Sequence, residues 1–252
     1  MKDPRERSAP SVAAAPERGH AAHEHRSPVG RRPADFRGKD TWSVFRIMAE
    51  FVEGFETLRP LWPAVSIFGS ARLAPDTRAY RDAEQIARTL AHEGFNIITG
   101  GGPGIMEAAN RGAREGPTES IGLNIKLPHE QEPNAYVETL LNHRYFFVRK
   151  VMFVKYAVGF VGLPGGFGTL DEIFEALTLK QTGKMKDFPV LLYGSDFWTG
   201  LVDWMHEQML SQGTISERDL GLFHVTDDLD EVVQRIRRHY AQRRAAGAHE
   251  TP

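Results

Sequence analysis

Short apolar runs alternate with amphipathic stretches from about residue 40 to residue 243. Apolar runs without regular polar alternation are typical of strands that are buried on both faces of a parallel sheet. The stretches between them repeat apolar residues every three or four positions, as helices packed on such a sheet do. We therefore expect strands at 64–70, 95–104, 120–128, 158–166, 188–194 and 221–226, an extended segment at 142–147, and helices at 41–58 (with Asp40 as the cap), 77–94, 105–116, 148–157, 169–184, 196–213 and 228–243.

This order of elements predicts an α/β protein with a single-domain, Rossmann-like, doubly wound fold. We expect a mainly parallel sheet of about six or seven strands with helices on both faces, and we assign residues 39–243 to this domain. Residues 1–38 are rich in Pro, Ala, Arg and His and hold hardly any large apolar side chain, so we expect a disordered extension. Residues 244–252 are expected to form a flexible tail.

The composition is that of an ordinary globular protein, with 41% hydrophobic and 25% charged residues. The formal net charge of -2 gives no reason to expect nucleic acid as a partner. The chain has no cysteine for a disulfide, a thiolate metal site or a thiol nucleophile, and we expect neither a metal nor a cofactor. No apolar run reaches the length of a membrane span and no secretory signal is recognisable, so we expect a cytoplasmic protein without a membrane partner.

Three of the expected strands run into glycine-rich turns, with the sequences FGSAR, TGGGPGI and LPGGFGT. Ligands of open parallel sheets bind beyond the carboxyl ends of the strands, so three such turns at one edge predict a single crevice lined by backbone amides. No Lys-Ser/Thr pair follows the glycines as in a P-loop, and Ile105 stands where the dinucleotide fingerprint needs its third glycine. These turns therefore favour a smaller phosphate-bearing ligand.

Thr169 and Glu172 form a T-x-x-E pattern directly before an apolar helical run. Taken alone, the pattern predicts a capping box, in which the two side chains bond to backbone amides at the helix start. A carboxylate at a helix N-terminus should stay ionised, which suits the stabilisation of a cation or the orientation of a water molecule. Glu175 and Thr178 continue the same ridge and are otherwise read as a solvated helix face.

Arg149 and Lys150 lie where the segment NHRYFF passes into the helical VRKVMFVKYA. Two cations near a helix N-terminus oppose the helix dipole, which indicates that they face an anion. A surface pair that keeps the helix soluble remains the alternative.

The motifs GGGPGIMEAANRGA, FFVRK and PGGFGTLDE together resemble the Lonely Guy family of cytokinin riboside 5′-monophosphate phosphoribohydrolases, whose members are often labelled lysine decarboxylase-like. The resemblance covers about residues 40–240, and the longer chain is similar to the second-type bacterial branch. It implies hydrolysis of the N-glycosidic bond of a nucleoside 5′-monophosphate, with AMP or a cytokinin riboside monophosphate as substrate, and a homodimer or higher homo-oligomer. Plant members carry Met-His-x-Arg-Lys where this chain has Phe-Phe-Val-Arg-Lys, so contacts to the base are expected to differ.

The resemblance also implies roles for individual residues. Arg149 and Glu172 match the catalytic pair, with Glu172 near the ribose C1′ and Arg149 on the phosphate or the ribose hydroxyls. The 5′-phosphate is expected on the amides of Gly166 to Thr169 at the helix N-terminus. The substrate-contacting positions implied are Lys150, Gly165, Gly166, Gly168, Thr169 and Thr178, with Gly69, Ser70, Gly101 and Gly102 completing the nucleotide crevice.

Two other functions fit parts of the pattern. Molybdenum-cofactor carrier proteins resemble the same family and hold a phosphorylated ligand without hydrolysing it, but a carrier has no use for a carboxylate at C1′. A pyridoxal-phosphate decarboxylase would need a Schiff-base lysine beside a phosphate site. Lys150 and Lys155 are the conceivable candidates, and neither lies in a sequence context that favours this reading.

Overall fold

The computed structural model describes residues 34–127, 132–185 and 188–246, and side-chain placement from residue 41 onward. Contacts divide the chain into two compact units, residues 1–41 and 42–252. The first unit contributes only the opening turns of a helix to the described part of the chain. Residues 1–33 of the expected disordered extension and 247–252 of the expected tail lie outside the described residues, whereas 34–38 and 244–245 are helical, so those parts of the two predictions are wrong.

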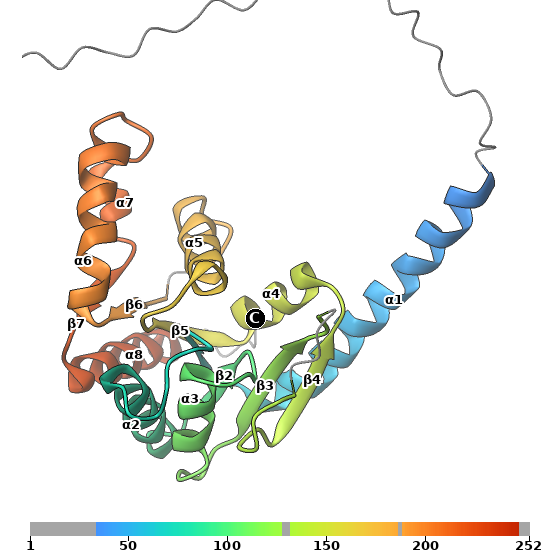
Figure 1. The fold of residues 1–252 in the computed structure, drawn as a ribbon, viewed down its shortest axis with the longest axis horizontal. Helices are drawn as coiled ribbons and strands as arrows, with labels where there is room; N and C mark the ends of the chain where they lie inside the picture. The colour runs from blue at the N-terminus through green and yellow to red at the C-terminus, as the bar shows by residue number, and fades with distance from the viewer. Residues whose placement is uncertain (1–33, 128–131, 186–187, 247–252) are drawn as a thin grey trace, which may run out of the picture. The chain divides into compact units, whose positions relative to one another are not determined.

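Within the described residues, seven strands form one sheet in the order β4-β3-β2-β1-β5-β6-β7, and every neighbouring pair is parallel. The order reverses between β1 and β5, so the chain winds outward first in one direction and then in the other (Figure 1). This confirms the predicted doubly wound α/β fold, and it places the topological switch point beside the carboxyl ends of β1 and β5. The strands are β1 Ala64–Phe68, β2 Asn96–Thr99, β3 Ser120–Ile125, β4 Thr139–His143, β5 Ala157–Gly162, β6 Val190–Tyr193 and β7 His224–Thr226.

Helices cover both faces of the sheet, and a separate apolar cluster is buried between the sheet and the helices on each face. One face packs on α2, α3 and α8, and the other packs on α1, α4, α5 and α6. The helices are α1 Ala34–Leu58, α2 Arg78–His92, α3 Ile105–Ala113, α4 Phe146–Lys155, α5 Phe167–Gln181, α6 Ser195–Trp204, α7 Glu217–Leu220 and α8 Leu229–Ala245, with a 3-10 turn Arg59–Leu61 and a π-helical turn Met205–Leu210.

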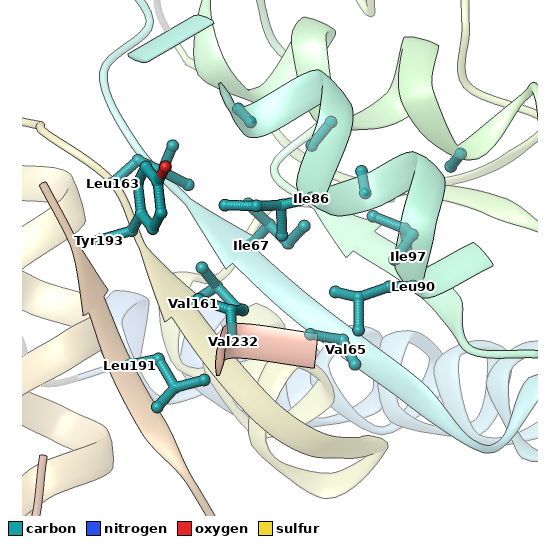
Figure 2. Close-up of a cluster of buried hydrophobic side chains, with 14 of the residues drawn as sticks. Val65, Ile67, Ile86, Leu90, Ile97, Val161, Leu163, Leu191, Tyr193 and Val232 are labelled. Carbon is teal, nitrogen blue, oxygen red and sulfur yellow. The ribbon is translucent and has the colours of Figure 1, made fainter. Parts of the chain in front are cut away.

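The central strands are buried on both sides, as their unbroken apolar runs predict. Every residue of β1, β3 and β5 is buried. Figure 2 shows the cluster on the first face, where Val65 and Ile67 of β1 meet Ile86 and Leu90 of α2. Burial of this kind holds the strand ends, and therefore the turns that follow them, in fixed positions.

Most helix and strand predictions are confirmed, with three corrections at element starts. The first helix begins at Ala34, so Asp40 lies inside it and is not its cap. Residues 142–147 were expected to be extended, but strand β4 ends at His143 and α4 begins at Phe146. The two phenylalanines ahead of Arg149 are therefore part of the helix. The helix expected to start at Thr169 starts at Phe167.

No helix in the described residues is both long and apolar enough to cross a membrane.

Candidate active site

Backbone hydrogen bonds join the three glycine-rich turns. The Ser70 amide after β1 donates to the Pro164 carbonyl after β5 at 3.0 Å, and the Ile105 amide at the start of α3 donates to the Ser70 carbonyl at 3.0 Å. The Leu163 amide donates to the Phe68 carbonyl at 2.8 Å. The expectation that these turns lie at one edge of one sheet is therefore correct, and the turn after β1 links the other two.

A cavity of about 660 Å³ opens above these turns. Its walls come from the ends of β1, β2, β3 and β5 and from the starts of α3, α4 and α5. Its volume lies in the range of pockets that take small organic ligands. Of the residues expected at the site, it brings together Gly69, Ser70, Gly102, Arg149, Gly166, Gly168, Thr169 and Glu172.

The N-terminus of α5 opens into this cavity without a side-chain cap. Gly166 is the N-cap residue and no side chain bonds to the first amides, so the predicted capping box of Thr169 and Glu172 is wrong. The T-x-x-E pattern makes Thr169 the N-cap, but the observed N-cap is Gly166, three residues earlier, which places Thr169 inside the first turn. Uncapped first-turn amides with the positive end of the helix dipole behind them form an anion site.

Arg149 reaches the cavity from the first turn of α4. Its Nε donates to the Leu123 carbonyl of β3 at 2.7 Å, and its guanidinium carbon lies 5.1 Å from the centroid of the Phe153 ring. Burial lowers the pKa of Arg149, against the favourable charge of Glu172. A Cβ added to Gly100 would lie 2.4 Å from Nη2 of Arg149, so the glycine leaves the space that the guanidinium fills.

Glu172 lies in the cavity wall with only 7% of its surface exposed. Burial raises its pKa to about 7, and the charges of Lys150 and Arg149 act in the opposite direction. The expectation that Glu172 stays ionised is therefore wrong, because desolvation outweighs the charges of Lys150 and Arg149. A carboxyl group with a pKa near 7 exchanges its proton at physiological pH, as groups that perform acid–base chemistry do.

Four of the expected site residues do not line the cavity. Lys150 turns toward carboxylates of α5, Gly101 packs on Gly122 of β3, and Gly165 lies against the Thr169 side chain. Thr178 is exposed on α5, and its hydroxyl donates to the Phe174 carbonyl of the same helix at 2.8 Å. The T-x-x-E-x-x-E-x-x-T spacing drifts around the helix, so the last member leaves the face that Glu172 shares with the cavity.

Other cavity residues were not predicted. Arg72 follows β1, and Asn124 lies at the carboxyl end of β3. A polar residue near the carboxyl end of a strand is a signal that could have identified both. Apolar walls come from Met106, Ile125, Leu127, Phe146 and Phe167. Phe167 is 93% exposed at the cavity, and the sequence reads it only as the variable residue of a glycine turn.

His143 is a buried residue beside this site that the sequence did not indicate. It ends β4 with 2% of its surface exposed, and neither ring nitrogen has a hydrogen-bond partner within the described residues. Its Nδ1 lies 3.7 Å from Glu50 Oε2. Burial, together with the charge of Arg149, lowers the pKa of His143 to about 4, so the ring is neutral at physiological pH.

Among the residues that the structure describes, no group of three or more His, Asp or Glu side chains could hold a metal ion. The polar side chains that line the cavity belong instead to Ser70, Arg72, Asn124, Arg149, Thr169 and Glu172.

Comparison with known proteins places these features in a family. A family model with the description "Possible lysine decarboxylase" matches residues 106–236, which include Arg149 and Glu172. The chain is 30% identical over 145 residues to the cytokinin riboside 5′-monophosphate phosphoribohydrolase LOG of Oryza sativa subsp. japonica, covering 55% of this chain and 58% of the rice protein. It is 28% identical over 154 residues to the enzyme of the same name from Mycobacterium marinum, covering 60% of this chain and 82% of that protein.

A bifunctional cytokinin biosynthesis protein from Fusarium pseudograminearum is 28% identical over 191 residues, and the match spans 39% of its length. The chain thus matches less than two thirds of the rice and fungal relatives. Among solved structures, the molybdenum cofactor carrier protein of Chlamydomonas reinhardtii has a TM-score of 0.54 at 22% identity, covering 71% of this chain and 98% of that chain. At this identity the likeness shows a shared fold. The match to more than half of the sequence shows that the chain belongs to the Lonely Guy family, the proteins whose family model is described as "Possible lysine decarboxylase".

Proposed function

We propose that this protein hydrolyses the N-glycosidic bond of a nucleoside 5′-monophosphate, releasing the free base and ribose 5-phosphate. One observation carries the proposal: Glu172, Arg149 and the uncapped start of α5 line the same cavity. The relatives named as cytokinin riboside 5′-monophosphate phosphoribohydrolases support it. AMP and cytokinin riboside monophosphates are the substrates to test first.

The phosphate of the substrate would bind the first amides of α5, at Gly166 to Gly168. Backbone amides and the helix dipole favour a dianion there without a lysine in the cavity wall. Arg149 would donate to the phosphate or the ribose hydroxyls, and its position is fixed by its bond to the Leu123 carbonyl. A guanidinium suits this task because it offers several donors in one plane.

Glu172 would act at C1′ of the ribose. Cleavage of the C1′–N bond returns the bonding electron pair to the base and leaves positive charge on the ribose, as in glycoside hydrolysis. The carboxylate form of Glu172 stabilises that charge and accepts a proton from the attacking water, whose oxygen forms the new bond to C1′. The base leaves with one proton, so the overall reaction consumes one water. Binding energy from the distant phosphate holds the ribose so that its C1′ faces Glu172.

A carrier of a phosphorylated ligand is the second candidate, because solved molybdenum cofactor carrier and binding proteins share the fold. The buried carboxyl group of Glu172 favours the enzyme. Desolvating a carboxyl group costs stability, and a site that only holds an anion gains nothing from a potential negative charge.

The deciding experiment is a panel of nucleoside 5′-monophosphates, with released base and ribose 5-phosphate quantified by chromatography. We expect turnover of at least one purine monophosphate and none of the matching nucleosides, because these lack the phosphate. Glu172→Gln keeps the shape of the side chain and should reduce turnover by about 100-fold or more. Tight binding of monophosphates without base release by the wild-type protein would favour the carrier.

We also propose that the protein acts in the cytoplasm as a homodimer or larger homo-oligomer. Trp42, Phe45, Met48 and Val52 repeat at helical spacing on α1 and are each more than half exposed, at 65%, 58%, 55% and 53%. An apolar stripe of this kind is typical of a protein–protein interface. Sedimentation of the wild type and of Phe45→Glu tests the assembly, with dissociation expected in the variant and a monomeric wild type contradicting it.

A further inference from the structure

Lys150 follows Arg149 directly, but its side chain leaves the cavity. Successive residues of a helix point about 100° apart, so Arg149 and Lys150 leave α4 in different directions. Arg149 lines the cavity, whereas Lys150 does not. The lysine is 15% exposed and lies between α4 and α5.

Three carboxyl groups of α5 surround the Lys150 ammonium. Its Nζ lies 2.9 Å from Asp171 Oδ2, 2.5 Å from Glu175 Oε2 and 3.9 Å from Glu172 Oε2. Asp171 and Glu175 are four residues apart, so the ammonium bridges two successive turns with Glu172 between them. These bonds tie the start of α4, which carries Arg149, to the start of α5, which carries Glu172.

The charges around Glu172 make this lysine decisive for its ionisation. Lys150 and Arg149 favour the carboxylate, whereas Asp171, Glu175 and burial favour the protonated form. Of the two cations, Lys150 has the larger effect on the pKa of Glu172, and its ammonium lies within 4 Å of all three acids. Without Lys150, the three carboxyl groups would lie close together. Arg149 would then be the remaining cation among the groups that act on Glu172.

We propose that Lys150 is a positioning residue that holds the Glu172 carboxyl group in place and favours its carboxylate form, and that it does not bind the substrate. This inference rests on the proposed function for its catalytic consequence. Its structural part concerns only the carboxyl group and the three side chains around it. It departs from the substrate-binding role that the family resemblance implies for this position.

The test measures the titration of Glu172 without any substrate. In protein labelled with carbon-13 at the glutamate side-chain carboxyl, the Glu172 signal is assigned by its loss in Glu172→Gln and followed against pH. We expect Lys150→Met to raise the midpoint by roughly one pH unit, and Lys150→Arg to restore it, since the loss of an adjacent opposite charge has an effect of this size. Glu175→Gln should move the midpoint the other way, because it removes a like charge.

Lys184→Met is the matched control, since it removes the same charge from an exposed position beyond the end of α5 and should leave the midpoint unchanged. The second readout is the pH profile of kcat/KM, in which the acidic limb should move upward in Lys150→Met and downward in Glu175→Gln. An unchanged midpoint and profile, with a KM for the monophosphate at least tenfold higher, would overturn the proposal and make Lys150 a substrate ligand. If the midpoints move as expected and no monophosphate is cleaved by the wild type, the positioning role stands and the proposed reaction fails.

Discussion

The starts of α3 and α5 both follow a glycine-rich turn at the same sheet edge, yet they differ in what approaches them. At α3 the Ile105 amide donates a hydrogen bond to the Ser70 carbonyl, so it is not available to a ligand. A Cβ on Gly104 would lie 2.4 Å from that carbonyl oxygen. At α5 a Cβ on Gly166 or Gly168 would meet no atom within 4 Å. The first turn is filled by neighbouring backbone, and the second is open.

This difference separates two uses of glycine that look alike in the sequence. In the turn before α3 the glycine permits close packing, and it also adopts a φ of +68° that other residues rarely accept. In the turn before α5 the glycines leave the helix amides accessible to a ligand. We therefore expect changes in the first turn to reduce stability, and changes in the second to reduce binding.

Gly104→Ala should have the largest effect. The methyl group overlaps the Ser70 carbonyl and the backbone is left-handed, so the free energy of unfolding should fall by about 2 to 5 kcal/mol. Urea unfolding measures this. Gly183→Ala is the control, because Gly183 has a similar φ of +65° with nothing within 4 Å, and it should cost only about 1 to 2 kcal/mol. Equal losses in the two variants would remove the packing argument.

Arg149→Lys tests the catalytic role of the arginine whose guanidinium lies against Gly100 in the turn after β2. A lysine cannot replace the planar guanidinium that bonds to the Leu123 carbonyl and reaches the cavity, so kcat/KM should fall by about 100-fold, equivalent to about 2.7 kcal/mol. Steady-state kinetics with the best monophosphate provides the measurement. Arg237→Lys on α8, where the arginine pairs with an exposed Glu93, should behave like the wild type. Wild-type kinetics in Arg149→Lys would exclude Arg149 from the catalytic pair.

The pH dependence of stability tests the buried carboxyl group at the open turn. The pKa of Glu172 is raised from 4.5 to about 7 in the folded protein, so the folded state holds a proton that the unfolded state lacks between these values. The free energy of unfolding should therefore increase as pH falls from about 7 toward 4.5. Relative to Glu172→Gln, the wild type should gain about 1 to 3 kcal/mol over this range. A pH-independent difference between the two proteins would show that Glu172 titrates normally.

Gly168→Ala should have the smallest effect and should act on binding. Alanine is favoured over glycine in a helix and meets no neighbour here, so stability should change by less than about 1 kcal/mol. The methyl group narrows the approach to the first amides of α5, and KM for a monophosphate should rise roughly fivefold, or about 1 kcal/mol. A KM equal to that of the wild type would place the phosphate elsewhere in the cavity.

Much of the site was predictable because it depends on strand ends. The turns after β1, β2 and β5 were recognised from glycines that follow buried apolar runs, and their meeting at one edge follows from a parallel sheet. The motif resemblance then selected Arg149 and Glu172, which the fold brings into one cavity. Phe167 and His143 were missed because an exposed residue at a helix start and a buried strand residue have no sequence pattern of their own.

Sequence alone determined the doubly wound α/β architecture, the order of its strands and long helices, and the pair of residues expected to act, because these depend on local periodicity and on motifs of fixed spacing. Only the tertiary structure decided which glycine turn is open, where Lys150 points and how readily Glu172 ionises. Those properties depend on the distances between atoms from separate elements. The Lys150 ammonium lies on α4 and its three acidic partners on α5, and the burial that raises the pKa of Glu172 exists only after the helices have packed on the sheet.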